Sequence, residues 1–93
     1  MSDPLYAYVV SFDGSVGRKR FTDAIDREAE IANWYACLPN TVFVVSALHA
    51  KPLSRLLREV TGVDRIIVVD ANTDRSGWLP KRAWRFLREP KRA

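Results

Sequence analysis

The sequence predicts an α+β protein built on a four-stranded antiparallel sheet, for three reasons. Strand-length runs of apolar, β-branched and aromatic residues occur near the start, in the middle and towards the end of the chain, and helical periodicities separate them. A length of 93 residues suits one domain, residues 1–93, with a modest core. A composition of 47% hydrophobic and 28% charged residues is typical of globular proteins and argues against disorder.

The first strand is predicted from Leu5 to Asp13, because this aromatic and β-branched run ends on a carboxylate and is followed by Gly14. Two largely apolar sets of side chains alternate along it, so both faces should be covered, by helices or by a partner. A helix from about Arg18 to Ile31 should follow, since apolar residues recur there at helical spacing.

The middle of the chain predicts a β-hairpin. Residues 33–38 and 41–47 are rich in aromatic and β-branched side chains, and Pro39-Asn40 supplies turn residues between them. The alternative extends the first helix through Leu38 and leaves only one strand. The hairpin is favoured, because Trp34 and Tyr35 beside the run 42–45 suit packing across paired strands.

A second helix is expected from about Lys51 to Val60, with Pro52 in its first turn and Gly62 just after its end. Residues 65–70 contain a continuous apolar run at 66–69, which predicts a last strand inside the sheet or under cover. The resulting order βαββαβ is the ferredoxin-like arrangement, in which the strands lie in the order 4-1-3-2 and both helices cover one face.

Residues 71–93 add a polar loop and a basic C-terminal helix, expected to open at residues 78–80 and to end near Arg88. Its apolar positions include tryptophans too large for a solvated tail, so the helix should dock on its own sheet or on a neighbouring subunit. The aromatic residues of the first strand are expected beneath this helix or beneath a dimer partner. The candidate interface residues are therefore Tyr6, Tyr8, Trp78 and Trp84.

The net charge of +4 is unevenly distributed along the chain. Seven of the fifteen basic residues fall within residues 75–93, and a second cluster occupies residues 18–20. Such clusters attract the phosphates of RNA or DNA, although a solvated surface and a basic tail would look the same. The candidate nucleic-acid-binding residues are Arg18, Lys19, Arg20, Lys81, Arg82, Arg85 and Arg88.

Several protein classes are not expected from the sequence. A single cysteine, Cys37, excludes a disulfide within the chain. The N-terminal residues lack the features of a signal peptide, and no apolar run is long enough to span a bilayer. We therefore expect a cytoplasmic protein that does not associate with membranes.

Three stretches of the chain resemble one protein family. Tyr-Val-Val-Ser-Phe-Asp at residues 8–13, followed by a turn and a helix, is similar to the small CRISPR-associated ferredoxin-fold proteins. It is more similar to their stand-alone relatives, the SinR-family proteins and the GhoS-type antitoxin endoribonucleases. Residues 43–48 resemble the family's third strand, and residues 77–81 with Ala83-Trp84 resemble the SinR-family ending. This resemblance implies a homodimer and a setting in host defence, phage biology or a toxin–antitoxin system.

Two functions are consistent with these patterns. In the favoured one, the protein is a non-catalytic dimer that binds nucleic acid or a protein partner, and Asp13 caps a turn. In the alternative, which the resemblance implies, Asp13 is the catalytic metal ligand of an endoribonuclease or another endonuclease. Two Asp13 side chains would then share Mg²⁺ across a two-fold axis, with Ser11, Ser15 and residues 18–20 near the phosphate. Asp70 should stay apart from Asp13, because antiparallel neighbours end at opposite edges of the sheet.

Overall fold

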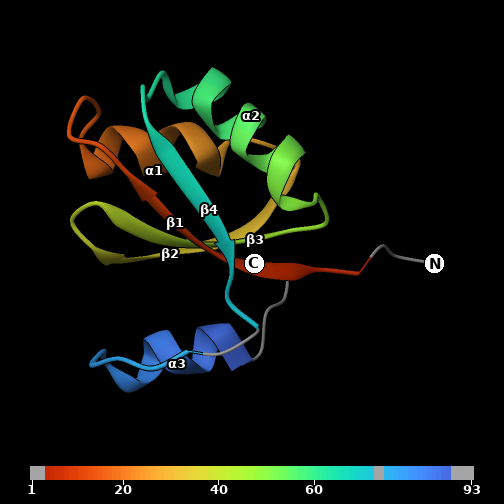
Figure 1. The fold of residues 1–93 in the computed structure, drawn as a ribbon, viewed down its shortest axis with the longest axis vertical. Coiled ribbons are helices and arrows are strands. Elements are labelled where there is room, and N and C mark those ends of the chain that lie inside the picture. Colours follow the sequence, from red (N-terminus) through yellow and green to blue (C-terminus); the bar gives the residue numbers. More distant parts are fainter. Residues whose placement is uncertain (1–3, 73–74, 89–93) are drawn as a thin grey trace.

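The computed structural model describes residues 4–72 and 75–88, and within these the chain forms four strands and three helices. Their order is β1 (Tyr6–Phe12), α1 (Arg18–Asp26), β2 (Ile31–Leu38), β3 (Thr41–Ser46), α2 (Ala50–Thr61), β4 (Ile66–Asp70) and α3 (Lys81–Arg88). The strands form one antiparallel sheet in the order β2-β3-β1-β4 (Figure 1). This confirms the predicted fold class, with the sheet read from its other edge.

β1 lies in the centre of the sheet and pairs with β3 on one side and β4 on the other. Tyr8 is the register partner of both Val44 on β3 and Asp70 on β4. Asp70 therefore lies beside the first half of β1, whereas Asp13 follows its last residue. The expected separation of these two acids is confirmed.

The molecule has three layers, with α1 and α2 on one face of the sheet and α3 on the other (Figure 1). Side chains that alternate along β1 pack on the two faces of the sheet in turn. Tyr8, Val10 and Phe12 are buried in the core beneath α1 and α2, and Ala7 is buried beneath α3. α3 packs on the sheet of its own chain, which is one of the two expected docking arrangements.

The first helix is shorter than predicted, ending at Asp26 rather than near Ile31. The Ile31 N–H donates to the Glu28 carbonyl to close a tight turn, and Ile31 then pairs with Ser46 on β3. The Ser46 hydroxyl reinforces this corner by donating to the Glu30 carbonyl at 2.7 Å. Pairing with the buried strand β3 outweighs the helical preference of residues 27–32, and it also excludes a helix through Leu38.

The remaining boundaries differ from prediction by a few residues at most. Gly62 ends α2 in the left-handed conformation, with φ of 77°, as a glycine just past a helix should. α3 begins at Lys81 instead of opening at Trp78. β4 is an edge strand whose residues Ile67 and Val69 are exposed, so it is neither inside the sheet nor covered on both faces. No helix of the described residues is long and apolar enough to cross a bilayer.

Candidate nucleic-acid interface

Four cations project from the outer side of α3, and we call them the α3 basic face. The sequence Lys-Arg-Ala-Trp-Arg-Phe-Leu-Arg places Ala83 and Leu87 one turn apart, and both are buried against the sheet. The exposed cations occupy the rest of the helix surface: Lys81, Arg82, Arg85 and Arg88. The same amphipathic pattern thus creates the docking side and the charged side.

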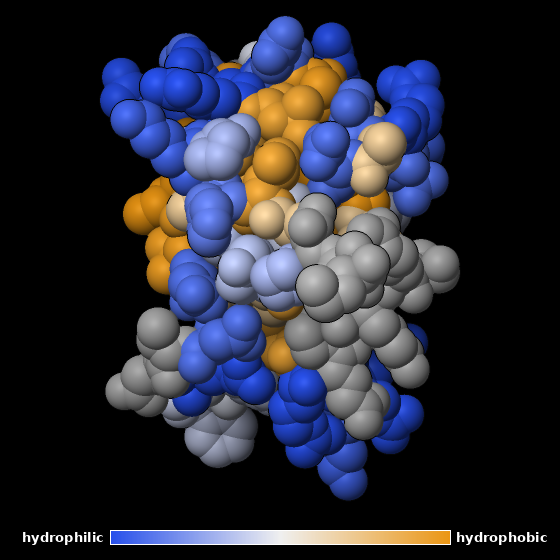
Figure 2. Space-filling view, turned by 90° about the vertical axis from the view of Figure 1, so that its right-hand side faces the viewer, coloured by the Kyte–Doolittle hydropathy of each residue, from blue (hydrophilic) through white to orange (hydrophobic). Residues whose placement is uncertain are grey.

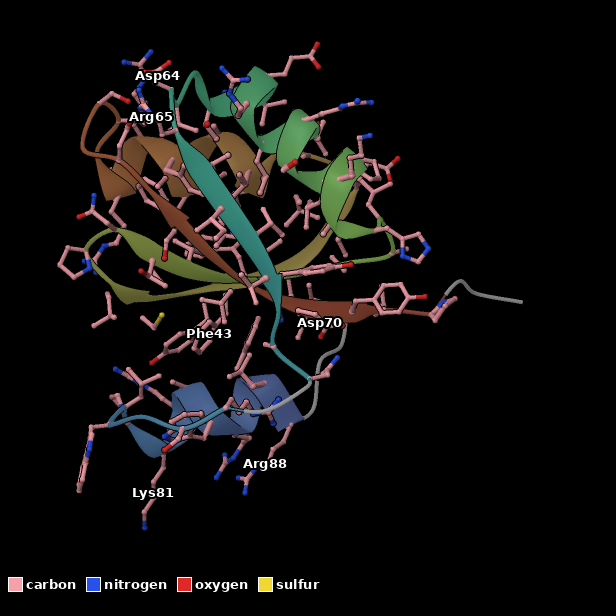
Figure 3. All side chains as sticks on the ribbon, viewed as in Figure 1. Phe43, Asp64, Arg65, Asp70, Lys81 and Arg88 are labelled. Atoms are coloured by element: carbon pink, nitrogen blue, oxygen red, sulfur yellow. The ribbon has the colours of Figure 1, made fainter. Side chains whose placement is uncertain are left out.

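Aromatic contacts hold α3 in place on the sheet. The Phe86 ring lies 5.8 Å from Tyr35 on β2 and 6.4 Å from Phe43 on β3, measured between centroids. Figure 3 shows Phe43 pointing from the sheet towards α3, whereas Lys81 and Arg88 point away from the sheet. The α3 basic face is therefore carried on a packed helix and not on a loose tail.

The electrostatics of α3 favour an anionic partner. None of its eight residues is acidic, so four positive charges lie along about 12 Å of helix with no acid on the same element. Like charges at this spacing repel one another, and a polyanion relieves that repulsion. Arginine guanidinium groups also match phosphate oxygens with paired hydrogen-bond donors.

The second predicted cluster, Arg18 to Arg20, lies elsewhere. It forms the first turn of α1, which covers the opposite face of the sheet from α3. Lys19 donates to the Asp23 carboxylate at 2.8 Å, and this acid raises the pKa of the lysine. Figure 2 shows hydrophilic side chains at both ends of the molecule, at the top where α2 lies and at the bottom where α3 lies. The structure therefore does not bring the predicted basic residues together into one surface.

Asp13 is built into a turn that joins two segments far apart in sequence. Its Oδ1 accepts hydrogen bonds from the backbone N–H and the hydroxyl of Ser15, and its Oδ2 accepts one from the Arg65 N–H at 3.1 Å. The Asp13 N–H donates in return to the Arg65 carbonyl, also at 3.1 Å. The Ser15 hydrogen bonds hold the pKa of Asp13 below its usual value, with a smaller contribution from Arg65. This carboxylate ties the loop after β1 to the start of β4.

The residues around Asp13 do not fit a magnesium site within one chain. Both carboxylate oxygens already accept protein hydrogen bonds, and the described residues contain no group of three His, Cys, Asp or Glu side chains that could hold a metal. The only histidine, His49, packs against Tyr6 with the two rings tilted and their centroids 5.4 Å apart. Tyr6 and Asp13 are seven residues apart along β1, about 23 Å, so His49 cannot act as a base there.

The serines of the nuclease hypothesis are also separated from one another. Ser15 donates its hydroxyl to Asp13. The Ser11 hydroxyl is hydrogen-bonded to that of Thr41, with 3.0 Å between the two oxygens, and Ser11 follows the β1 alternation that faces α3. No step of phosphodiester cleavage can be derived from this arrangement.

The four predicted interface aromatics have different environments. Tyr8 is buried beneath α1 and α2 and donates its hydroxyl to the Leu48 carbonyl at 2.8 Å, while Tyr6 packs against the same core. Neither lies beneath α3, because they point to the other face of the sheet. Trp84 does pack on the α3 side, as expected, whereas Trp78 is fully exposed at 101%. An exposed tryptophan three residues before Lys81 is part of the candidate surface and not a structural anchor.

Two features of the α3 side were not singled out from the sequence. Ile67 and Val69 on β4 are 59% and 49% exposed, and the alternation of an edge strand would have indicated them. A cavity of about 310 Å³ lies between the sheet, the segment 75–79 and α3, and we call it the α3 cavity. Three segments far apart in sequence line it, so no local pattern could have indicated it.

Comparison of the chain with family models, with curated proteins and with solved structures finds no match. The resemblance described under Sequence analysis therefore stays a prediction.

Proposed function

We propose that this protein binds nucleic acid through the α3 basic face and is not catalytic at Asp13. The observation that carries the proposal is the four-cation face of a helix whose other side is anchored by buried Ala83 and Leu87. A packed cationic helix presents its charges in fixed positions, so phosphates can be bound without the cost of ordering a flexible tail.

RNA is the preferred ligand in this proposal, because the family that the chain resembles includes endoribonucleases. The contacts themselves would be to phosphate, which RNA and DNA share. Binding to a protein partner, and the defence, phage or toxin–antitoxin setting, stay predictions from the resemblance. The metal-dependent nuclease has less support, because Asp13 is engaged in turn hydrogen bonds and has no companion ligands among the described residues.

A homodimer fits the exposed side of β4. This edge strand pairs only with β1 among the described strands and has the sequence Ile-Ile-Val-Val-Asp, without lysine, proline or a bulge to protect it. Two copies of an edge strand can pair antiparallel about a two-fold axis, which would also bury Ile67 and Val69. We include this dimer in the proposal.

The test is binding of a fluorescein-labelled single-stranded RNA, read by fluorescence anisotropy. A variant with Lys81, Arg82, Arg85 and Arg88 replaced by glutamine should lose most of its affinity. The matched control replaces Arg18, Lys19 and Arg20 by glutamine and should bind almost as the unmodified protein does. Circular dichroism should show that both variants fold. Equal binding by the α3 variant and the unmodified protein would refute the proposal.

A further inference from the structure

The α3 cavity lies between the sheet, the segment 75–79 and the packed side of α3, and it has the character of a small aromatic site. Its walls include Phe43 from the sheet and Trp84 and Leu87 from α3, and Trp78 stands at its exposed rim. Its volume of about 310 Å³ is at the lower end of the range of about 300–1,000 Å³ for small-molecule sites. That size suits one flat ring system better than a long chain or a large ligand.

The walls of the cavity are held by their own packing. A side-chain carbon built at Gly77 would lie 3.6 Å from the Trp84 ring, so the backbone at Gly77 lies directly against this indole. On the sheet side, Phe43 stacks with Tyr35 at 6.4 Å and with Phe86 at 6.4 Å. The aromatic groups that a ring would meet are therefore positioned before any ligand arrives.

The rim of the cavity is cationic and aromatic. Arg75 lines the opening, where its Nη1 donates to the Ala71 carbonyl at 2.6 Å and so locates the guanidinium. Trp78 is separated by only two residues in the sequence from Lys81, the first cation of the basic face, and its indole is fully exposed. A ligand that combines a flat ring with a phosphate matches both the cavity and its rim.

We propose that the α3 cavity receives a base of single-stranded nucleic acid, with Trp78 stacking on a base at the rim and Arg75 and Lys81 contacting the adjacent phosphates. The inference rests on the proposed function, because the same strand would continue along the α3 basic face. Bases in a duplex are already stacked and paired, so only an unpaired base can enter such a site. A purely apolar occupant, such as a protein side chain, would make no use of Arg75 or Lys81.

Cys37 provides a native reporter for occupancy. It is the only cysteine of the chain, it lines the cavity, and its thiol donates to the Thr41 carbonyl at 3.3 Å. A base in the cavity should block reagents from this thiol. Its rate of reaction with iodoacetamide can therefore be measured with and without an oligonucleotide.

The experiment compares a single-stranded RNA with a strand of the same length and charge that lacks its bases. We expect the base-bearing strand to bind at least tenfold tighter and to slow Cys37 alkylation severalfold. Trp78→Ala should remove most of this preference, and Trp78→Phe should restore part of it. Trp78 is fully exposed, so neither substitution disturbs packing.

The failure of this inference and of the proposed function can be told apart. Equal affinity for both strands, with Cys37 unprotected, would overturn base recognition and leave phosphate binding by α3 in place. Binding of neither strand would overturn both. Protection of Cys37 that rises with protein concentration in the absence of nucleic acid would show a second copy in the cavity, and would also overturn base recognition.

Discussion

The salt dependence of binding gives a quantitative prediction for the α3 basic face. The structure presents four exposed cations there. Each phosphate neutralised on a single strand contributes about −0.7 to the slope of log K against log salt, so four contacts contribute about −2.8. Raising monovalent salt from about 50 to about 200 mM should then weaken binding by about fiftyfold through these contacts alone.

Removing the charges tests that magnitude. The quadruple glutamine variant of Lys81, Arg82, Arg85 and Arg88 should have a slope that is shallower by about 2.8, and each single variant one that is shallower by about 0.7. Anisotropy titrations of a labelled single-stranded RNA at four or five salt concentrations give the slopes directly. Competition with unlabelled RNA at each concentration excludes effects of the dye.

The control is the triple glutamine variant of Arg18, Lys19 and Arg20. Its slope should change by less than the contribution of one phosphate contact, which is about 0.7. Lys19 is already paired with Asp23, and this cluster is on the other side of the sheet. A slope that becomes shallower by about 2 in this variant and stays unchanged in the α3 variant would refute our reasoning. The phosphate-binding surface would then be the N-terminal turn of α1.

Three further predictions concern the rest of the structure. Asp13→Ala should lower the free energy of unfolding, because it removes the Ser15 and Arg65 hydrogen bonds, and should leave RNA binding intact. The pKa of Asp13 is lowered in the folded state, so its contribution is present above the ordinary carboxyl pKa and is lost as the pH falls through the folded value. In urea unfolding, the variant should therefore be less stable than the unmodified protein at neutral pH, and the difference should disappear in acid. A variant that loses RNA binding but keeps the full free energy of unfolding would contradict the turn role of Asp13. Val69→Lys should convert a dimer to a monomer in light scattering, and an unchanged mass would exclude the β4 edge. Leu87→Ala should lower the free energy of unfolding by about 2–5 kcal/mol and weaken RNA binding by loosening α3. Leu57→Ala, which truncates an equally buried leucine of α2 on the other face of the sheet, should destabilise the protein without weakening RNA binding at temperatures where the variant is folded.

Local sequence patterns were enough to predict most of the fold. The alternation in β1, the helical spacing of Leu53, Leu57 and Val60, and Gly62 after α2 each depend on residues within one or two turns. The amphipathic character of α3, with its buried Ala83 and Leu87, was readable for the same reason. Such patterns also determined that the chain is α+β and that its C-terminal helix is basic on one side.

The tertiary structure decided the points that depend on contacts between distant segments. α1 ends at Asp26 because the next residues pair with β3, and helical periodicity carries no information about that ladder. Tyr6 and Tyr8 face α1 and α2 because the chain places α3 on the opposite side of the sheet. The same placement puts the basic cluster of residues 18–20 and the α3 basic face on opposite sides of the sheet, which the composition of the chain could not indicate.

The role of Asp13 shows the division most clearly. The sequence by itself determined that a carboxylate follows β1 and precedes a glycine, a pattern that favours a turn but is also compatible with a metal ligand. The Arg65 N–H that occupies Oδ2 comes from 52 residues away and is brought there only when β4 pairs with β1. The α3 cavity likewise exists only once the sheet, the segment 75–79 and α3 have packed together. Periodicity and turn chemistry act over a few residues and determine the elements, whereas hydrogen bonds and cavities between elements depend on how those elements pack.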